Sequence, residues 1–458
     1  MKPKVCWFVV VACLMGWAGM VPGNLRVTWA GSPLVIMGDS LGEGVQSGDA
    51  NLRTQRYSYG VWVSRQARLH LTLPYIVSGP LGVVGDTSVR HRLFPYTKTA
   101  NLAVSGADSW SILHDRALAR SPRAIASETE LVLFPRTGSQ IEIVEAIEPE
   151  TVLCWIGSND VLSAVLAYDQ LNVSQLPLFM TSPQDFEANY RELLFRLHGS
   201  ARRVVLANIP NVTDIAFLLD NEDLERFLGP GKYLPEGSRT TLAALFMILL
   251  GFEDINLFQN ADYVLDETEV ALIEERTHAL NGIIQEVAQE FGFPVVNIAE
   301  KFREYALNPP IYAGVPITRR YLGGLFSLDG VHPSNIGHAL VANEFLSILQ
   351  SGYGWNAPLL SAATLNDIAA QDPFVDLDGD GRVRGRPLAG MLETLALVLG
   401  ISGDVENSLA QRTVKELTVE DRERALSLLE PLRNPSSRGV PVWSCNEIYR
   451  VMHKLFRP

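Results

Sequence analysis

Four short apolar runs, each bounded by turn residues, constrain the fold of this chain more than any other feature. They are Leu34–Met37, Thr151–Ile156, Arg203–Ala207 and Pro294–Ile298, and amphipathic helix patterns lie between them. Apolar runs of this length without polar alternation are typical of strands that are buried on both faces. Strands that alternate with helices in this way predict a parallel sheet with helices covering both sides.

Two stretches depart from this alternation. Residues 220–262 contain prolines and the apolar run Leu242–Leu250, which is too short to span a bilayer, and we interpret them as a helical insertion. Two interpretations of that run remain open. It is an ordinary buried core helix, or it forms a lid or an acyl-binding surface near a functional site. Residues 352–458 are mainly helical in pattern and predict a small separate region after a main domain at 31–351.

The N-terminus and the net charge limit the partners. A lysine-containing start followed by the apolar run Val5–Val21 predicts a secretory signal at 1–23, or an uncleaved anchor that would allow membrane association. We therefore expect a secreted, periplasmic or cell-surface protein. The chain has 38 Lys and Arg against 51 Asp and Glu, a net charge of −13, which argues against a nucleic-acid partner. Its four cysteines provide neither a disulfide framework nor a CxxC site.

Ser40 is the candidate nucleophile, because it directly follows the first apolar run, in a glycine-containing turn at the carboxyl edge of the expected sheet. A serine hydroxyl needs a base and an oxyanion-stabilising group to act. His332, which precedes the Pro333–Ser334 helix start, is the candidate base, and Asp329 lies three residues earlier, close enough in a turn to orient it. Two further strand-to-turn junctions offer oxyanion donors, the amide of Gly106 and the side-chain amide of Asn159.

These turns together resemble the motifs of the SGNH hydrolases of the GDSL lipase/esterase family. Gly38–Leu41 resembles the nucleophile motif, Gly106 the glycine motif, Gly157–Asp160 the asparagine motif and Asp329–Pro333 the Asp-x-x-His motif. All four occur in the family's order, between residue 34 and about residue 350.

The resemblance implies a three-layer α/β/α flavodoxin-like domain, ester hydrolysis and no metal cofactor for catalysis. It implies Ser40, Asp329 and His332 as catalytic residues, and Ser40, Gly106 and Asn159 as the oxyanion hole. Gly38–Gly42 also satisfies the G-x-S-x-G nucleophile elbow of the α/β-hydrolases. That fold needs several strands before its nucleophile, whereas Ser40 follows the first strand, so we reject this alternative.

A second candidate site is the acidic loop that begins at Asp376. Asp376, Asp378 and Asp380 match the start of an EF-hand-type calcium loop within 376–387, but Pro387 occupies the twelfth position, where a bidentate acid is expected. The loop is either a weak structural Ca²⁺ site or a solvated turn. His338, four residues after Ser334, is expected on a helix surface.

The motifs favour a secreted serine ester hydrolase that works through an acyl-enzyme on small-molecule or lipid carboxylic esters. One alternative is carbohydrate O-deacetylation on the same fold. Another is a non-catalytic, calcium-stabilised surface-binding protein that retains the fold. A panel of esters of different acyl length separates these three functions.

Overall fold

The structure is a computed structural model, and it describes residues 32–78, 90–167, 176–249 and 253–378 with the two-residue strands β12 (Arg382–Val383) and β13 (Trp443–Ser444). The expected signal or anchor at 1–23 and most of the expected region 352–458 lie outside the described residues. Within the described ranges, no helix combines the length and the apolar character needed to cross a bilayer.

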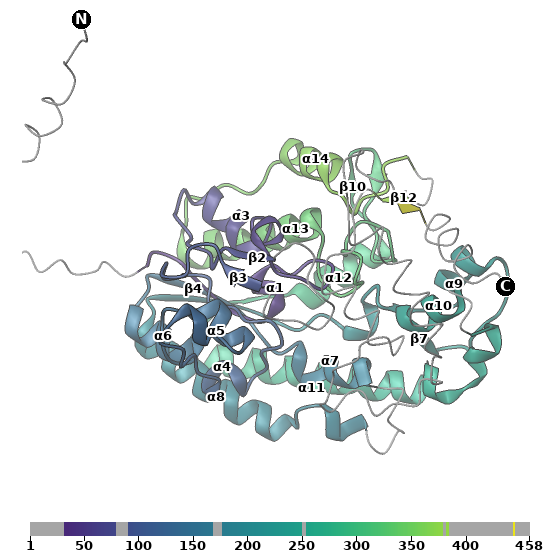
Figure 1. Cartoon of the computed structure of the whole chain (residues 1–458), viewed down its shortest axis with the longest axis horizontal. Helices are drawn as coiled ribbons and strands as arrows, with labels where there is room; N and C mark the ends of the chain where they lie inside the picture. The colour runs from purple at the N-terminus through teal and green to yellow at the C-terminus, as the bar shows by residue number, and fades with distance from the viewer. Residues whose placement is uncertain are drawn as a thin grey trace, which may run out of the picture. The chain divides into compact units, whose positions relative to one another are not determined.

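A parallel sheet in the order β1-β4-β5-β9 forms the centre of the fold (Figure 1). Its strands lie in the four apolar runs: β1 (Val35–Gly38), β4 (Thr151–Trp155), β5 (Arg203–Ala207) and β9 (Val295–Val296). Residues 100–104 run parallel to β1 on its other side, where Ile36 donates to Ala100 (3.0 Å) and accepts from Leu102 (2.8 Å). With this segment counted, the order is that of flavodoxin-like sheets, whose ligand crevice lies at the carboxyl ends of the first and third strands. Here those strands are β1 and β4.

Helices cover both faces of the sheet, which confirms the three-layer α/β/α prediction. On one face lie α3 (Tyr59–Gln66) and α13 (Asn335–Tyr353), and on the other α6 (Gln140–Ile147), α8 (Pro183–Ser200) and α11 (Glu267–Phe291) (Figure 1). The rings of Tyr59 and Phe345 stack between α3 and α13 with their centroids 4.7 Å apart. A capping box at Asp266 begins α11, since its side chain accepts from the amide of Glu269.

Shorter elements connect these layers. Outside residues 218–265, the other helices of the described residues are α1 (Ser40–Glu43), α2 (Leu52–Gln55), α4 (Ser111–His114), α5 (Glu128–Leu133), α7 (Asn159–Ala167), α12 (Ile298–Leu307) and α14 (Ala362–Gln371). Two hairpins pair β2 (Ile76–Ser78) with β3 (Arg90–Arg92) and β10 (Ile311–Tyr312) with β11 (Val315–Pro316). The 3₁₀ turns are η2 (Pro122–Ala124), η4 (Leu176–Phe179), η5 (Val212–Asp214), η6 (Ile255–Gln259) and η7 (Ala261–Tyr263).

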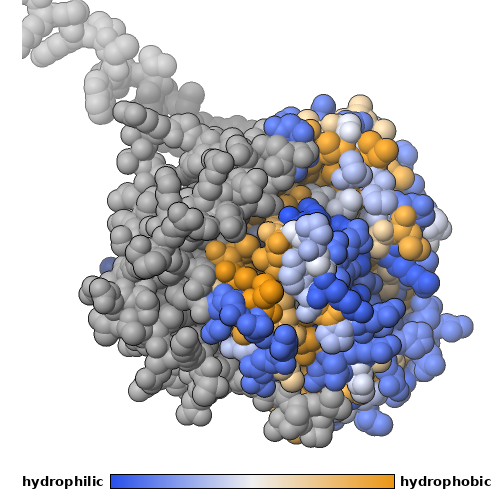
Figure 2. Space-filling view, turned by 90° about the vertical axis from the view of Figure 1, so that its right-hand side faces the viewer, coloured by the Kyte–Doolittle hydropathy of each residue, from blue (hydrophilic) through white to orange (hydrophobic). Residues whose placement is uncertain are grey.

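The segment expected to be a helical insertion, 220–262, holds the helices α9 (Asn221–Leu228) and α10 (Leu242–Leu249) and the strand β7 (Arg239–Thr241). The strands β6 (Leu218–Leu219) and β8 (Val264–Leu265) lie just outside its two ends and pair antiparallel with β7, which forms a small sheet. Most of α10 is buried, with Phe246 edge-on to Tyr321, so the apolar run is a core helix and not an exposed lid. Figure 2 views the side of the domain that carries this segment, where apolar side chains lie near the centre and hydrophilic ones cover much of the right-hand part.

The start of the expected C-terminal region packs against the α/β domain. Gln66 in α3 donates to the carbonyl of Pro358 (2.8 Å), and Asn343 in α13 exchanges two hydrogen bonds with the backbone of Leu360. The carboxylate of Asp372 accepts from the amide of Ile336 at the start of α13 (2.7 Å). Residues up to 378 therefore share the packing of the main domain.

Candidate active site

The carboxyl end of β1 presents Ser40 at the start of a short helix. Gly38 has a φ of +135°, and a Cβ there would lie 2.0 Å from the carbonyl oxygen of Trp155 in β4, so only glycine fits. Asp39 caps α1 by accepting from the amide of Leu41 (2.9 Å). The turn from strand to helix therefore places Ser40, which is partly exposed, at the edge of the sheet.

His332 lies within hydrogen-bond distance of both Ser40 and Asp329. Its Nε2 is 2.8 Å from the Ser40 Oγ, and its Nδ1 is 2.7 Å from the Asp329 Oδ2. Ser40 and His332 are 292 positions apart in the chain, so the fold brings them together. A hydroxyl that faces one ring nitrogen, with a carboxylate on the other, is the arrangement of a nucleophile, its base and an orienting acid.

The carboxylate of Asp329 is held by five hydrogen bonds. Oδ1 accepts from the amides of Val331 and His332 (both 2.9 Å) and from the hydroxyl of Ser327 (3.1 Å). Oδ2 accepts from the amide of Gly48 (2.7 Å) as well as facing the His332 ring. Burial alone would raise the pKa of Asp329, but the charge of His332 and these hydrogen bonds outweigh it and lower the pKa to about 2. Asp329 is therefore ionised at neutral pH.

Asp39, the residue before Ser40, lies in a different environment from Asp329. It is 1% exposed, and among the described residues its Oδ2 has no hydrogen-bond partner. Burial raises the pKa of Asp39 to about 7, although the hydrogen bond from Leu41 and the charge of His332 act in the opposite direction. Burial also raises the pKa of Asp160 to about 6, despite its hydrogen bonds from Ser109.

The sequence predicts three oxyanion donors: the amides of Ser40 and Gly106 and the side-chain amide of Asn159. Within the described ranges, the amides of Ser40 and Gly106 donate to no other protein group. Gly106 has a φ of +79°, and a Cβ there would meet nothing within 4 Å. Glycine is therefore required by the left-handed backbone conformation and not by a lack of space for a side chain. Asn159, the first residue of α7, uses one Nδ2 hydrogen to bind the carbonyl of Ala107 (2.8 Å), which leaves its second hydrogen for a ligand.

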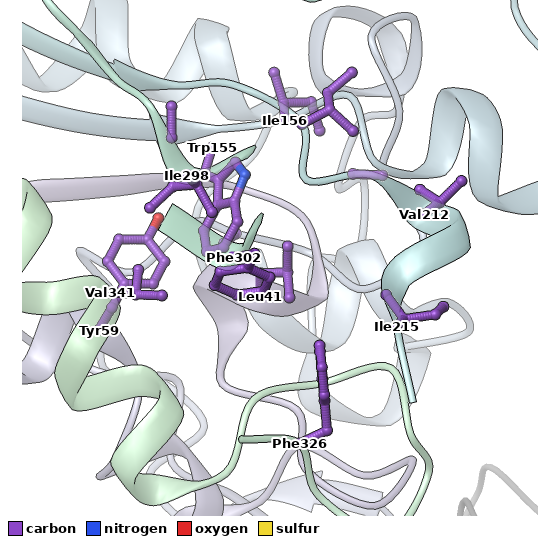
Figure 3. Close-up of a cluster of buried hydrophobic side chains, with 14 of the residues drawn as sticks. Leu41, Tyr59, Trp155, Ile156, Val212, Ile215, Ile298, Phe302, Phe326 and Val341 are labelled. Carbon is purple, nitrogen blue, oxygen red and sulfur yellow. The ribbon is translucent and has the colours of Figure 1, made fainter. Parts of the chain in front are cut away.

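An apolar pocket lies beside Ser40. Its polar lining is Asp39, Ser40, Ser158 and Asn159, and its apolar lining is Leu41, Trp155, Leu162, Pro210, Val212, Ile215, Phe302, Phe326, Val331 and Pro333. Figure 3 shows Leu41, Ile215 and Phe326 pointing into this space from three different segments. The rings of Phe302 and Phe326 meet edge-on with centroids 5.9 Å apart. Gly106 lines an adjacent polar cavity instead, together with Ser105 and Asp115.

Several supporting residues were missed by the sequence analysis. Gln140 in α6 makes two hydrogen bonds to the backbone of Gly38: its Oε1 accepts from the amide (2.9 Å) and its Nε2 donates to the carbonyl (2.8 Å). The hydroxyl of Ser327 accepts from the amide of Ser47 (2.9 Å), so a loop after α1 supports the acid turn. Only the Ser-Gly pair at Ser47 signals that loop in the sequence, and nothing local marks Gln140.

The expectation that His338 lies on a helix surface is wrong. His338 is fully buried, as is every residue from Asn335 to Ala342, because the first two turns of α13 are enclosed on all sides. Burial and the charge of His332 lower the pKa of His338 to about 3, so the ring is neutral. A helix that is enclosed all round shows no polar face in its sequence, which is why the pattern misplaced this residue.

The acidic loop is described only in part. Asp378 is exposed, Asp376 is partly buried, and Asp380 and Pro387 lie outside the described residues. Over the ranges that the structure describes, no three His, Cys, Asp or Glu side chains are grouped so that they could hold a metal ion. The calcium site stays a prediction.

Comparison with known proteins finds one family. The sequence model of the GDSL-like lipase/acylhydrolase family matches residues 34–345. No curated protein matches the chain.

Solved structures show remote similarity. They include an alpha/beta hydrolase enzyme from the metagenome of Lake Arreo, Spain, with 17% identity, a TM-score of 0.35 and coverage of 69% of this chain and 94% of that one. A catalytic mutant of an acetylxylan esterase from Geobacillus stearothermophilus has 16% identity, a TM-score of 0.32 and coverage of 69% and 94%. A GDSL-like lipase from Parabacteroides merdae has 14% identity, a TM-score of 0.34 and coverage of 69% and 93%.

Proposed function

The chain belongs to the GDSL-like lipase/acylhydrolase family and is a carboxylic ester hydrolase, and on that premise we propose that it works through an acyl-enzyme on Ser40. The observation that carries the proposal is the line of contacts from the Ser40 Oγ through the His332 ring to the Asp329 carboxylate, at 2.8 and 2.7 Å. A non-catalytic binding protein would have no use for an ionised acid, an imidazole and a hydroxyl in this order.

In the first stage, Nε2 of His332 takes the proton of Ser40 while Oγ attacks the ester carbonyl carbon. The carbonyl oxygen becomes an oxyanion, which accepts hydrogen bonds from the amides of Ser40 and Gly106 and from Nδ2 of Asn159. His332 then gives its proton to the leaving alcohol oxygen, and the carbon–oxygen bond to the alcohol breaks. Asp329 holds the ring orientation and stabilises the imidazolium that exists between these two transfers.

In the second stage, a water molecule takes the place of the alcohol. His332 removes a proton from the water as the water oxygen attacks the acyl carbon, and the same donors stabilise the second oxyanion. The bond to Ser40 Oγ breaks as His332 returns the proton to it. The products are the free acid and the original enzyme.

The lining of the pocket favours an ester with an apolar chain, of the kind found in lipids. Apart from four polar residues at the reacting end, the pocket is lined by aliphatic and aromatic side chains from five segments of the chain. Burying one CH₂ group against such a surface is worth about 0.8 kcal/mol. A sugar ring would leave its hydroxyl groups without partners there, so we rank carbohydrate O-deacetylation second.

We also propose that the protein is exported. This proposal depends on the charged start and apolar run of residues 1–23, with membrane association as the outcome if that segment is retained. Mass spectrometry of the N-terminal peptide, from the membrane fraction and from outside the cytoplasm, tests it. A shortened chain outside the cytoplasm supports export, and an intact chain in the cytoplasm contradicts it.

A panel of p-nitrophenyl esters from acetyl to palmitoyl, with acetylated xylan beside it, tests the catalytic proposal. We expect kcat/KM to increase from acetyl to medium acyl chains, and we expect Ser40→Ala to lose turnover on all of them. Ser347→Ala, which changes an exposed serine in α13, is the matched control and should leave turnover unchanged. Turnover of acetyl esters alone would favour deacetylation, and no turnover at all would favour a binding protein.

A further inference from the structure

Glu43 is a buried acid that the mechanism above does not use. It is the last residue of α1, three positions after Ser40, and its side chain is fully enclosed. Burial and repulsion by Glu128 raise the pKa of Glu43 well above its ordinary value, while the charge of Arg90 and hydrogen bonds from Ser105 act against the shift. A carboxyl group buried in this way is costly unless it makes specific hydrogen bonds, so its contacts indicate its role.

Both hydrogen bonds of Glu43 go to a single residue. The amide of Ser105 donates to the Glu43 Oε2 (2.7 Å), and the hydroxyl of Ser105 donates to the same oxygen (2.5 Å). The other oxygen, Oε1, has no hydrogen-bond partner among the residues that the structure describes. Glu43 therefore fastens the backbone just before Gly106 to the helix that carries Ser40.

The other end of the same turn is fastened to a different helix. The carbonyl of Ala107 accepts from Nδ2 of Asn159, at the first residue of α7 (2.8 Å). Gly106 thus lies between two anchored residues, with its own amide unpaired and its φ at +79°. A glycine in this conformation has little preference of its own, so its neighbours determine where its amide points.

We propose that Glu43 is a positioning residue that holds the Gly106 amide in place as an oxyanion donor. This inference rests on the proposed function, because it matters only if an oxyanion forms at Ser40. Oxyanion donors act over a short range, and a misplacement of about 1 Å can cost up to about 10² in rate. Loss of the contact between Glu43 and Ser105 should therefore destabilise the transition state more than it weakens binding of the ester.

The central test replaces Glu43 with Met, which has similar length and no acceptor, and with Gln, which keeps an oxygen for Ser105. We expect kcat of Glu43→Met per active site, counted by end-point labelling with a fluorophosphonate, to fall by about 10-fold or more, with KM within about 2-fold. Glu43→Gln should recover most of this loss. Oγ of Ser40 adds to the carbonyl carbon of a trifluoromethyl ketone inhibitor, and the ketone oxygen becomes an oxyanion at the position of the ester oxyanion. The inhibition constant of the ketone should therefore increase by the same factor by which kcat/KM falls.

Glu128→Gln is the matched control. Glu128 belongs to the same charged group, with its Oε2 2.6 Å from Arg90, but no hydrogen bond joins it to Ser105. This variant should keep kcat and ketone inhibition at wild-type values. A purely structural role for Glu43 would lower the melting temperature without changing kcat per labelled site.

The possible outcomes separate this inference from the proposed function. If wild type turns over esters and Ser40→Ala does not, the proposed function stands, and a wild-type kcat per labelled site in Glu43→Met overturns the inference alone. If Glu43→Met does not fold, Ser105→Ala decides, because it removes one of the two bonds and should lower kcat about 3-fold to 10-fold. An unchanged kcat in Ser105→Ala would also overturn the inference.

Discussion

The turns that carry Asp329 and Asp39 both lie at the Ser40 site, and they shift the pKa values of their carboxyl groups in opposite directions. Both groups are mostly withdrawn from water, yet the pKa of Asp329 is lowered to about 2 and that of Asp39 is raised to about 7. Asp329 accepts five hydrogen bonds and faces His332, whereas one oxygen of Asp39 has no partner among the described groups. Burial raises the pKa of both groups, so the charge of His332 and the hydrogen bonds to Asp329 decide which carboxyl group is the more ionised.

This difference has a consequence for the chemistry. A fixed negative charge next to His332 stabilises the imidazolium, but a second one beside Ser40 would repel the developing oxyanion. At neutral pH Asp329 beside His332 is ionised, whereas Asp39, which precedes Ser40 in the chain, is only partly ionised. Asp39 serves as a helix cap for α1, which a neutral group can also do.

The comparison predicts its largest effect for the paired variants Asp329→Asn and Asp39→Asn. Asp329→Asn should lower kcat/KM by about 10³–10⁴, because a neutral amide neither stabilises the imidazolium nor fixes the tautomer of His332. Asp39→Asn should change kcat/KM by less than about 10-fold, because asparagine keeps the oxygen that caps α1. Steady-state kinetics of both purified variants measure this, and losses of equal size would contradict the assigned roles.

Substitution of Asn159 tests whether its side-chain amide stabilises the oxyanion that forms at Ser40. Asn159→Ala should lower kcat by about 10²–10³ with a smaller change in KM, because the donor acts mainly in the transition state. Asn159→Asp, which has the same shape but no N–H and adds a negative charge, should be at least as impaired. If Asn159→Ala keeps the wild-type kcat, this turn has only a structural role.

A third prediction concerns stability and pH at Asp39. Because its folded pKa is raised from 3.8 to about 7, the folded protein binds an extra proton across this interval, and stability falls as the pH rises from about 4 to about 7. Asp39→Asn removes this dependence, so the unfolding free energy of wild type relative to the variant should fall by a few kcal/mol over that range. Urea unfolding at pH 4.5 and pH 7.5 measures it, and parallel changes in the two proteins would show that Asp39 is ionised throughout.

The smallest expected effect is at the acidic loop 376–387, where Asp378 is exposed, in contrast to the buried Asp39. Calcium at about ten times its Kd should stabilise the full-length chain by about 1.4 kcal/mol, with a Kd of about 10⁻⁴–10⁻³ M. Thermal melts with and without calcium, for wild type and Asp378→Asn, measure it, and kcat should not change. An identical melting temperature at millimolar calcium would leave only a solvated turn.

The sheet and the site residues Ser40, His332 and Asp329 could be predicted from sequence because each lies in a local pattern. The contact between Ser40 and His332, 292 positions apart, was implied by the resemblance of the motifs taken together. A buried strand and its turn lie within about ten residues, and the four motifs occur in a recognisable order. The small sheet of β6, β7 and β8 could not, since strands of two or three residues are too short for an alternation of polar and apolar residues to show.

The supporting residues depend on contacts that no local pattern contains. Gln140 reaches Gly38 across 102 positions, and Glu43 reaches Ser105 across 62. The sequence analysis does not single out Glu43, and only the packing around it shows that it is enclosed. His338 was misplaced for the same reason, because the enclosure of α13 is a property of the folded domain.

The most direct test of the central claim is to identify the residue that a fluorophosphonate labels. The reagent should add to the Ser40 hydroxyl alone, as found by peptide mapping of the labelled full-length protein, and Ser40→Ala should remain unlabelled. The reagent should label Asp329→Asn more slowly than wild type, because this variant loses the charge that stabilises the His332 imidazolium. It should label Asp39→Asn at about the wild-type rate, because that charge is kept. Labelling at another residue, or ester turnover that survives in Ser40→Ala, would contradict the assignment of Ser40 as the nucleophile.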